Sequence, residues 1–279
     1  MQVIYKTPEQ IELIRVSSLL VGDTLAEMAA LLKPGITTME LDRVAETFIR
    51  DQKASPAFKG YNGFPGSLCI SVNAEVVHGI PGKRILKEGD VVSIDCGVIK
   101  DGFFGDSAYT FIIGEVSPRI MELITVTKEC LYRAIEKARN GFRIGDIGAA
   151  VQDHAEEHNF GVVRELVGHG VGLKLHEKPE VPNFGKKGTG MLLKTGMVIA
   201  IEPMINAGRK GVKQLDDGWT IVTADLQPAA HFEHDVAIGK DKADVLSSFD
   251  KIEAAEALNI NLSKQQTISN TTEWPNKAS

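Results

Sequence analysis

Four acidic residues interrupt or end apolar, β-rich segments of this 279-residue sequence. Asp95 follows the run VVSI, and Glu202 follows MVIAI and precedes a proline. Asp106 and Glu233 lie beside aromatic residues, in FFGDSAY and HFEHD. A buried carboxylate is very costly unless a proton, a cation or several hydrogen-bond donors compensate its charge. Either each acid ends its strand in water, or the four share one site in which divalent cations remove their mutual repulsion.

His169 lies between glycines in the segment VGHGVG. Glycines on both sides allow close approach of the backbone to a ligand or a metal, so we interpret His169 as a metal ligand rather than a core histidine. His176 follows seven residues later and could reach the same cleft as a hydrogen-bond donor or acid–base group. His78 is its candidate partner from the first part of the chain.

Four carboxylates and one imidazole form a hard, oxygen-rich ligand set. Structural zinc sites are instead built from cysteine and histidine. This set favours Mn²⁺, Fe²⁺ or Co²⁺, and Zn²⁺ is also compatible with it. Two such ions about 3.5–4 Å apart, bridged by carboxylates, are used by aminopeptidases and phosphatases.

Other histidines give weaker signals. His154 and His158 have the i, i+4 spacing of a zinc-binding pair on a helix, but their surroundings, HAEEHNF, are polar and offer no third clustered ligand. We therefore expect them on a solvent-exposed helix face. His231 and His234 flank Glu233, and their roles stay open.

The chain repeats part of itself. The segment LKEGDVVSID (86–95) aligns without gaps on LKTGMVIAIE (193–202), with five of ten positions identical. The alignment pairs Asp95 with Glu202, and the upstream HGI at 78–80 corresponds to HGV at 169–171. Either two strand entries are alike by chance, or the chain is a duplicated α+β fold with halves near 1–115 and 116–240. We favour the duplication, because it would bring carboxylates and a histidine from each half to one seam.

Helices and strands alternate along the chain to position these residues. Thr7, Pro8 and Gln10 predict a capped helix start, and a second helix is expected from Thr37 or Thr38 with Leu41, Val44, Ala45 and Phe48 buried. Ser117-Pro118 predicts a helix that runs to Asn140-Gly141, and Asp146 is expected to cap another that runs to about His158. Further strands are expected at 67–72, 161–166, 197–201, 219–223 and 232–238.

A hairpin is predicted around Asp101-Gly102, between the β-rich runs 91–99 and 103–113. With a two-residue loop, position 95 pairs with 108, so Asp95 and Asp106 project from the same face. A three-residue loop would separate them unless a bulge intervened. Beyond residue 241 the pattern weakens, and the polar segment 261–279 is expected to be a flexible tail.

Composition restricts the class of protein. A content of 43% hydrophobic and 24% charged residues excludes a disordered chain, a collagen-like fibre and a coiled coil. The net charge of −6 disfavours a general nucleic-acid binder. Cys69, Cys96 and Cys130 form no disulfide framework, which favours a reducing compartment. Because no signal peptide or membrane span is visible either, we expect a cytoplasmic protein.

Several motifs over about residues 5–240 together resemble the type I methionine aminopeptidases, which are pita-bread metallopeptidases. The segments concerned are GYNGFPGSLCIS, VVHGIPG, IDCGVIKDGFFGD, GHGVGLKLHEKPEVPNF, IEPMIN, DGWT and FEHD. The resemblance implies one α+β catalytic domain over 1–240, with a curved antiparallel sheet, pseudo-twofold halves and helices on the outer face. Residues 241–279 would be a C-terminal extension. The implied activity is removal of the initiator methionine from new chains whose second residue is small.

The resemblance also implies roles for individual residues. Asp95 would chelate one divalent ion, His169 and Glu202 would hold a second, and Asp106 and Glu233 would bridge both. Glu202 would also move a proton, His78 would contact the substrate, and His176 would stabilise the tetrahedral intermediate or position the scissile carbonyl. The methionine pocket would be lined by Tyr61, Phe64, Cys69 and Trp219. Three residues depart from what is common in the family: Phe58 and Leu175, which bear on pocket shape, and Asp235, which bears on the hydrogen bonding of Glu233.

Other readings remain. Prolidases and Xaa-Pro aminopeptidases share the fold but usually carry a large domain ahead of it, and here the catalytic helices begin near residue 7. Type II methionine aminopeptidases carry a helical insertion, for which the 31 positions between Glu202 and Glu233 are too few. A metal-free adaptor would have lost ligands. The expected partners are nascent N-termini, with transient ribosome contact through basic residues, no DNA and no membrane, and the expected state is a monomer. The basic residues are Lys186, Lys187, Arg209, Lys210 and Lys213.

Overall fold

The first two helices begin where their capping residues predict. The computed structural model describes residues 2–268. In it, α1 (Pro8–Leu31) starts with a capping box between Thr7 and Gln10, and α2 (Thr38–Asp51) starts with one between Thr37 and Glu40. Along α2 the buried stripe is narrower than predicted, because only one edge of the helix packs on the core. Val44 is 40% exposed, whereas Leu41, Ala45 and Ile49 are fully buried.

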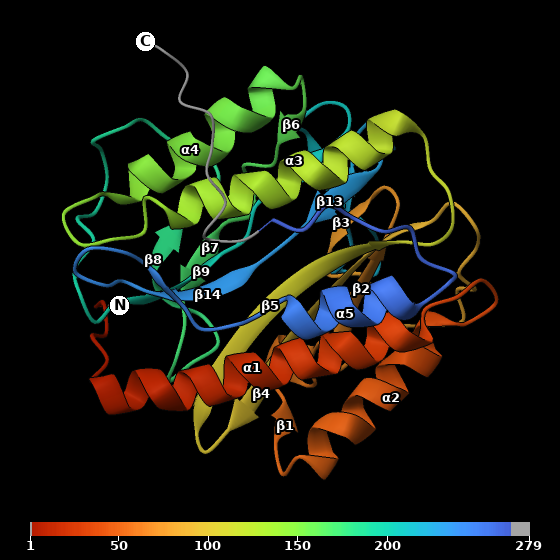
Figure 1. Cartoon of the computed structure of the whole chain (residues 1–279), viewed down its shortest axis with the longest axis horizontal. Helices are drawn as coiled ribbons and strands as arrows, with labels where there is room; N and C mark the ends of the chain where they lie inside the picture. The colour runs from red at the N-terminus through yellow and green to blue at the C-terminus, as the bar shows by residue number, and fades with distance from the viewer. Residues whose placement is uncertain (1, 269–279) are drawn as a thin grey trace.

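The predicted hairpin and its two-residue loop are confirmed. Strands β4 (Val91–Lys100) and β5 (Phe103–Ile112) pair antiparallel, and the loop residues Asp101 and Gly102 both have positive φ, 51° and 81°. Asp95 lies opposite Ala108, so Asp106 is two residues along on the same face. Figure 1 shows this long ribbon bending across the molecule.

The middle helices differ from prediction at their ends. α3 (Pro118–Ile135) begins at its Ser117 cap but stops well before Asn140, whose N–H donates instead to the carbonyl of Gly239. α4 (Ile144–Glu157) has Arg143, not Asp146, as its N-cap residue. The carboxylate of Asp146 accepts the Arg143 N–H at 2.8 Å from the third helical position. Arg143 is the last residue with extended backbone. The helix therefore starts at Ile144, two residues before the predicted cap.

The strands form short antiparallel sheets around the β4–β5 ribbon. Their order is β1-β4-β2 with β5 on β4, then β13-β10-β6, β11-β12-β3 and β15-β14-β9-β7-β8. Several are shorter than predicted, as at 161–166, where only two residues pair. The bounds of the remaining strands are β1 (Ser55–Pro56), β2 (Leu68–Val72), β3 (Glu75–Val77), β6 (Gly161–Val162), β7 (Gly168–Gly170), β8 (Glu177–Val181), β9 (Val198–Ile201), β10 (Met204–Asn206), β11 (Val212–Gln214), β12 (Ile221–Thr223), β13 (Ala229–His231), β14 (His234–Ala237) and β15 (Asp244–Val245).

The C-terminal part contains two features that the sequence did not predict. A helix, α5 (Asp250–Leu258), packs against α1. Residues 261–268 are not a free tail, because the Ser263 N–H donates to Ile112 and the Gln265 amide donates to the carbonyl of Thr110, both on β5. Ile268 is only 2% exposed. The rest of the predicted tail, 269–279, lies outside the described residues.

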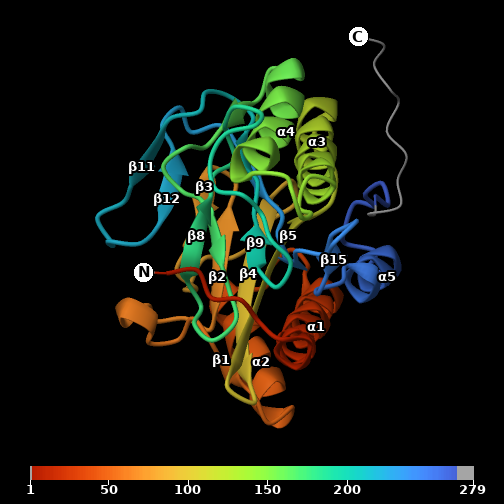
Figure 2. The same ribbon diagram turned by 90° about the vertical axis from the view of Figure 1, so that its left-hand side faces the viewer.

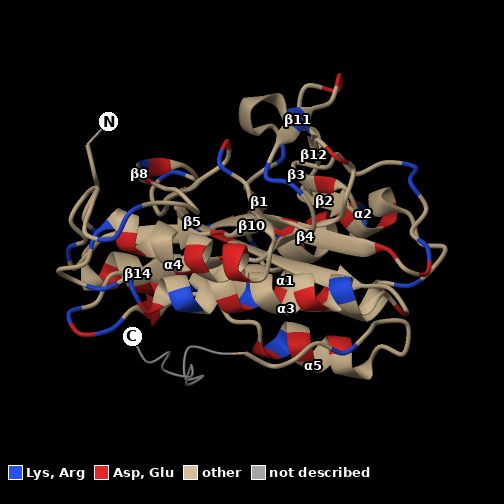
Figure 3. Ribbon diagram, turned by 90° about the horizontal axis from the view of Figure 1, so that it is seen from above, with Lys and Arg blue, Asp and Glu red and all other residues tan. Residues whose placement is uncertain are grey.

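Helices and sheets lie in separate layers. Figure 2 shows α1, α3, α4 and α5 on one side of the central strands, with β11 and β12 on the other side. The main core lies between the helices and the sheets and includes Tyr109, Phe111 and Phe232. Along the outward faces of the helices, acidic and basic residues alternate (Figure 3). Within the described residues, none of the helices combines the length and the apolar content that crossing a membrane requires.

The contact between α1 and β5 has no room for a side chain at Gly105. A Cβ atom there would lie 2.3 Å from the backbone nitrogen of Ser18. We therefore expect Gly105→Ala to lower the free energy of unfolding by at least about 1–3 kcal/mol, the usual cost of overpacking. Urea denaturation would measure this. Gly82→Ala is the matched control, since its Cβ would meet nothing closer than 3.9 Å, and equal stabilities of the two variants would contradict the prediction.

Candidate metal centre

A cavity of about 240 Å³ gathers every residue that the sequence analysis assigned to the site. One part of its lining is acidic and the other is apolar. Three further residues, Phe58, Asn62 and Leu175, complete the wall. The eleven predicted residues that line it are Tyr61, Phe64, Cys69, His78, Asp95, Asp106, His169, His176, Glu202, Trp219 and Glu233.

Each predicted ligand is held by a strand or by its end. Asp95 and Asp106 project from the same face of the β4–β5 ribbon. His169 is the central residue of β7, and Glu202 comes directly after β9, which pairs with β7. Glu233 lies in the two-residue gap between β13 and β14. The site is therefore built on sheet backbone, which restricts how far its ligands can move.

Hydrogen bonds between the Glu233 segment and β5 join the β4–β5 ribbon to the sheet that contains β7, β9 and β14. The Glu233 N–H donates to the carbonyl of Ala108 at 3.0 Å, and the Ser107 hydroxyl donates to the Glu233 carbonyl at 2.6 Å. Further along β5, the Thr110 hydroxyl donates to the carbonyl of His231 at 2.7 Å. These bonds hold Glu233 beside Asp106, although 127 positions separate the two in the sequence.

His169 faces the carboxylates through one ring nitrogen. Its Nδ1 lies 3.0 Å from the carbonyl of Gly170, which that nitrogen can contact only as a donor. Its Nε2 is thereby left as the free acceptor, 3.6 Å from Glu202 Oε1 and 3.9 Å from Asp106 Oδ2. One ligand atom each from Asp106, His169 and Glu233 lie within 4.8 Å of one another, which is close enough for one ion to bind all three.

Burial makes the charges of this cluster costly. It raises the pKa of Asp95 to about 7 and, together with the neighbouring carboxylates, holds the pKa values of Asp106, Glu202 and Glu233 well above their ordinary range. Burial also lowers the pKa of His169 to about 3, so the ring is neutral at pH 7, as a metal ligand must be.

Several oxygens of the cluster have no hydrogen-bond partner. Among the described residues, Asp95 Oδ1, Asp106 Oδ1 and Glu233 Oε1 are buried and unpaired. Buried carboxylate oxygens are rarely left so, because each loses its hydration without compensation. Divalent cations would satisfy all three at once, so the residues present fit a metal centre.

The apolar part of the cavity is a cluster of aromatic and aliphatic side chains around a thiol. Phe64 and Trp219 meet edge to face, with ring centroids 5.2 Å apart. Cys69 is buried, and burial raises the pKa of its thiol, which stays neutral. Phe58 and Leu175, the two departures from the family pattern, both belong to this wall.

His176 and Tyr61 connect the two parts of the cavity. The Tyr61 hydroxyl lies 2.7 Å from Nδ1 of His176, which leaves Nε2 of that ring for another partner. The rings of His176 and His169 are 4.3 Å apart between centroids. Burial lowers the pKa values of His176 and His78, which favours neutral imidazoles in the cavity.

Asp235 and His231, which lie beside the site, make contacts with it that the sequence did not predict. Asp235 accepts the N–H of Asp106 and the hydroxyl of Ser18, both at 2.7 Å. It therefore holds the backbone of one ligand, rather than acting on the hydrogen bonding of Glu233 as its position suggested. His231 Nε2 is buried without a hydrogen-bond partner, 3.7 Å from Glu202 Oε2. The sequence indicated only that both residues lie near Glu233 and that Asp235 departs from the family pattern.

The other histidines lie away from the cavity. His234 contacts the Tyr132 hydroxyl at 3.2 Å and the Ser247 hydroxyl at 2.7 Å, so its ring does not face the carboxylates. The predicted solvent-exposed face with His154 and His158 is wrong for His154, which is buried beside Glu129. Because Glu129 comes from α3, the local sequence around His154 gave no sign of it.

Comparison with known proteins agrees with this geometry. Residues 12–240 match the family described as metallopeptidase family M24. The methionine aminopeptidase 1 of Bacillus subtilis is 50% identical over 245 residues, which cover 88% of this chain and 99% of that protein. The chain belongs to metallopeptidase family M24. A further M24 relative, the methionine aminopeptidase of Escherichia coli, is 43% identical over 251 residues, covering 88% of this chain and 94% of that one.

Solved structures confirm the predicted α+β pita-bread fold for this M24 chain. The methionine aminopeptidase of Rickettsia prowazekii superposes with a TM-score of 0.87 at 40% identity, over 88% of this chain and all of that one. The prolidase of Pyrococcus furiosus shares the fold at a TM-score of 0.69 and 24% identity, but this chain covers only 65% of it. The boundaries of the two halves, near 115 and 240, stay a prediction.

Proposed function

We propose that this M24 metallopeptidase is a methionine aminopeptidase, which removes the initiator methionine from new proteins whose second residue is small. The observation that carries the proposal is a single cavity with an acidic, ligand-rich end and an apolar end containing a thiol. Relatives about 50% identical over nearly their whole length are methionine aminopeptidases.

The acidic end would hold two divalent ions, with Co²⁺, Mn²⁺, Fe²⁺ and Zn²⁺ all compatible with its donors. Asp95 would chelate one ion, His169 and Glu202 the other, and Asp106 and Glu233 would bridge them. Their unpaired oxygens and the free Nε2 of His169 support this assignment. When bound, the ions would supply Lewis-acid activation of a water and of the scissile carbonyl.

The chain's own side chains would position the peptide and move the proton. Glu202 lies between two imidazoles, 3.6 Å from His169 and 3.7 Å from His231. Burial and the neighbouring Asp95 and Asp235 carboxylates raise its pKa, which favours uptake of a proton. His176, held by the Tyr61 hydroxyl, has its Nε2 free to donate to the carbonyl oxygen of the scissile bond. His78, which lines the same cavity, would contact the substrate.

The apolar end would bind the methionine side chain. A thioether is weakly polar and polarisable, and it is favoured next to aromatic edges and a neutral thiol. Phe64, Trp219 and Cys69 offer these contacts, with Tyr61 at the rim. A proline-directed peptidase would instead need its specificity at the second residue, so the apolar end favours methionine over the Xaa-Pro alternative.

Peptide turnover tests the proposal against that alternative. With Mn²⁺ or Co²⁺ supplied, we expect kcat/KM for Met-Ala-Ser to exceed that for Ala-Pro-Ser by at least about 100-fold, because loss of the thioether contacts and a mismatched second residue each cost binding in the transition state. Liquid chromatography with mass detection would measure both. A preference for Ala-Pro-Ser would replace the proposal by a prolidase-like activity, and no turnover of either peptide with metal bound would favour an adaptor.

Partners and location follow from the same activity. The substrates would be the N-termini of nascent chains, and a monomer in the cytoplasm would suit three buried, free thiols. Ribosome contact through the basic loops stays a prediction. Lys187 is already paired with Asp153 at 2.8 Å, so its charge is partly compensated within the chain. Charge reversal at Lys186, Arg209 and Lys210 should lower ribosome co-sedimentation without changing tripeptide turnover if that contact exists.

A further inference from the structure

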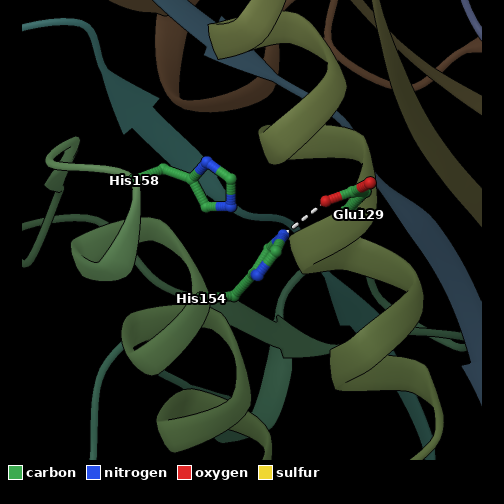
Figure 4. A group of neighbouring side chains, drawn as sticks. All are labelled: Glu129, His154 and His158. Carbon is green, nitrogen blue, oxygen red and sulfur yellow. Dashed lines mark hydrogen bonds and ion pairs between the residues drawn. The ribbon is translucent and has the colours of Figure 1, made fainter. Parts of the chain in front are cut away.

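A second group of metal-ligand side chains lies on the outer helices, apart from the cavity. α3 and α4 pack side by side (Figure 1). The Cys130 thiol of α3 lies 3.5 Å from the carbonyl of Val151 in α4. His154 and His158 lie on successive turns at the end of α4, and Glu129 faces them from α3 (Figure 4). None of these three residues lines the catalytic cavity.

The three side chains converge on one point. Nε2 of His154 lies 2.5 Å from Glu129 Oε2, and one ligand atom from each of the three residues lie within 4.8 Å of one another. Nδ1 of His158 lies 3.1 Å from the carboxylate of Glu122, and Figure 4 shows the other nitrogen of that ring turned towards His154 and Glu129. The arrangement leaves two imidazole nitrogens and one carboxylate facing the same space.

We propose that Glu129, His154 and His158 form a second metal site, which binds Zn²⁺ or a similar transition-metal ion and ties α3 to α4. Two imidazoles and a carboxylate are a common three-residue ligand set for zinc, with solvent in the fourth position. Glu122 matches the carboxylate that usually orients a metal-binding histidine by accepting the proton of its other nitrogen. Glu129 supplies a negative charge that attracts a cation, whereas the charge of Glu122 is partly compensated by Arg119, 2.9 Å away.

The geometry requires only a small adjustment for the ion. Donor atoms about 2.0–2.1 Å from a tetrahedral zinc are about 3.3 Å apart, so Glu129 must retreat by less than about 1 Å from His154. The Glu129 side chain is 20% exposed and that of His158 is 34% exposed, which gives the carboxylate room to move and the ion a path from solvent. The alternative is two separate hydrogen bonds, one between Glu129 and His154 and one between Glu122 and His158, with no ion bound.

The ligand types at the α3–α4 site favour a different metal from those in the cavity. Four carboxylates dominate the cavity, whereas two of the three ligands here are imidazoles. Imidazole-rich sites select zinc and copper, while oxygen-rich sites accept manganese readily. A chain supplied with Mn²⁺ and then with Zn²⁺ should therefore take up zinc at the α3–α4 site, in addition to any zinc that replaces manganese in the cavity.

A zinc titration of the full chain tests the proposal. The chain is first saturated with Mn²⁺, and Zn²⁺ is then titrated against a competing chelating dye. We expect the native chain to bind one more Zn²⁺ than His158→Gln, with the variant at least about tenfold weaker at that site. Glu129→Gln should show the same loss while keeping a hydrogen bond to His154. Glu136→Gln, which removes an exposed carboxylate at the end of α3, is the matched control and should bind as the native chain does.

Thermal unfolding gives a second readout that does not depend on activity. Zn²⁺ should raise the unfolding midpoint of the native chain and of Glu136→Gln, and should raise that of His158→Gln less, because an ion that binds only the folded chain stabilises it. Midpoints measured in chelator show whether the variants fold equally well. Equal zinc stoichiometry and equal zinc-induced shifts in the native chain, His158→Gln and Glu129→Gln would overturn the proposal and leave an ordinary hydrogen bond.

Discussion

Replacing His169 with alanine is expected to reduce divalent-metal binding in the cavity and to lower methionyl-peptide turnover by at least about 100-fold, since loss of an outer partner of a metal ligand already costs 10–100-fold. The ring provides an imidazole nitrogen, Nε2, that faces the carboxylates, because its Nδ1 is held by the carbonyl of Gly170. Without it, the acidic end of the cavity keeps its four carboxylates but loses its neutral ligand. Atomic absorption after dialysis and tripeptide turnover would measure the two effects.

A bridging carboxylate should behave in the same way. Glu233→Ala removes an oxygen that is buried without a partner and that lies with Asp106 and His169 in one cluster. Glu136→Ala is the control, because it also removes a carboxylate but lies outside the cavity, and it should retain manganese-dependent turnover. If Glu233→Ala kept full metal-dependent activity, the assignment of a bridging role to Glu233 would be wrong.

The candidate metal ligands of the cavity could be predicted because their signals are local, whereas its apolar wall was expected only from the family resemblance. Asp95 ends an apolar run, His169 lies between glycines, and the Asp101-Gly102 turn fixes the register that places Asp95 and Asp106 on one face. Each of these patterns covers about ten residues or fewer. The repeat predicted that the segments of Asp95 and Glu202 meet, and both residues line the cavity, although Asp95 lies within β4 and Glu202 follows the end of β9.

The features that were missed depend on contacts between distant segments. Glu129 reaches His154 from another helix, and Asp235 holds the backbone of Asp106 from 129 positions away. The segment 261–268 lacks apolar periodicity, yet its polar groups reach β5 through hydrogen bonds. Periodicity measures burial of apolar faces, so it is silent about a polar segment that is held by backbone bonds.

The free α-amine of the substrate should be as decisive as the metal ligands. We expect N-acetyl-Met-Ala-Ser to be cleaved at least about 100-fold more slowly than Met-Ala-Ser, a difference of about 2.7 kcal/mol in transition-state stabilisation. The thioether and the scissile bond are the same in both peptides. Only the amine, which can carry a positive charge or offer a lone pair, is changed to a neutral amide that does neither.

The shape and charge of the cavity give the reason. A methionine side chain bound against Phe64, Cys69 and Trp219 would place its α-nitrogen at the carboxylate end of the cavity, which would stabilise a cationic or metal-ligating amine. An acetyl group there would put a carbonyl oxygen against acidic side chains and would add bulk to a cavity of about 240 Å³. Binding of both peptides should be compared with their turnover, because recognition of the amine predicts that the acetylated peptide loses both. Cleavage of the acetylated peptide within tenfold of the free one would mean that the carboxylate end of the cavity does not read the chain terminus, and the enzyme would then not be restricted to the first residue.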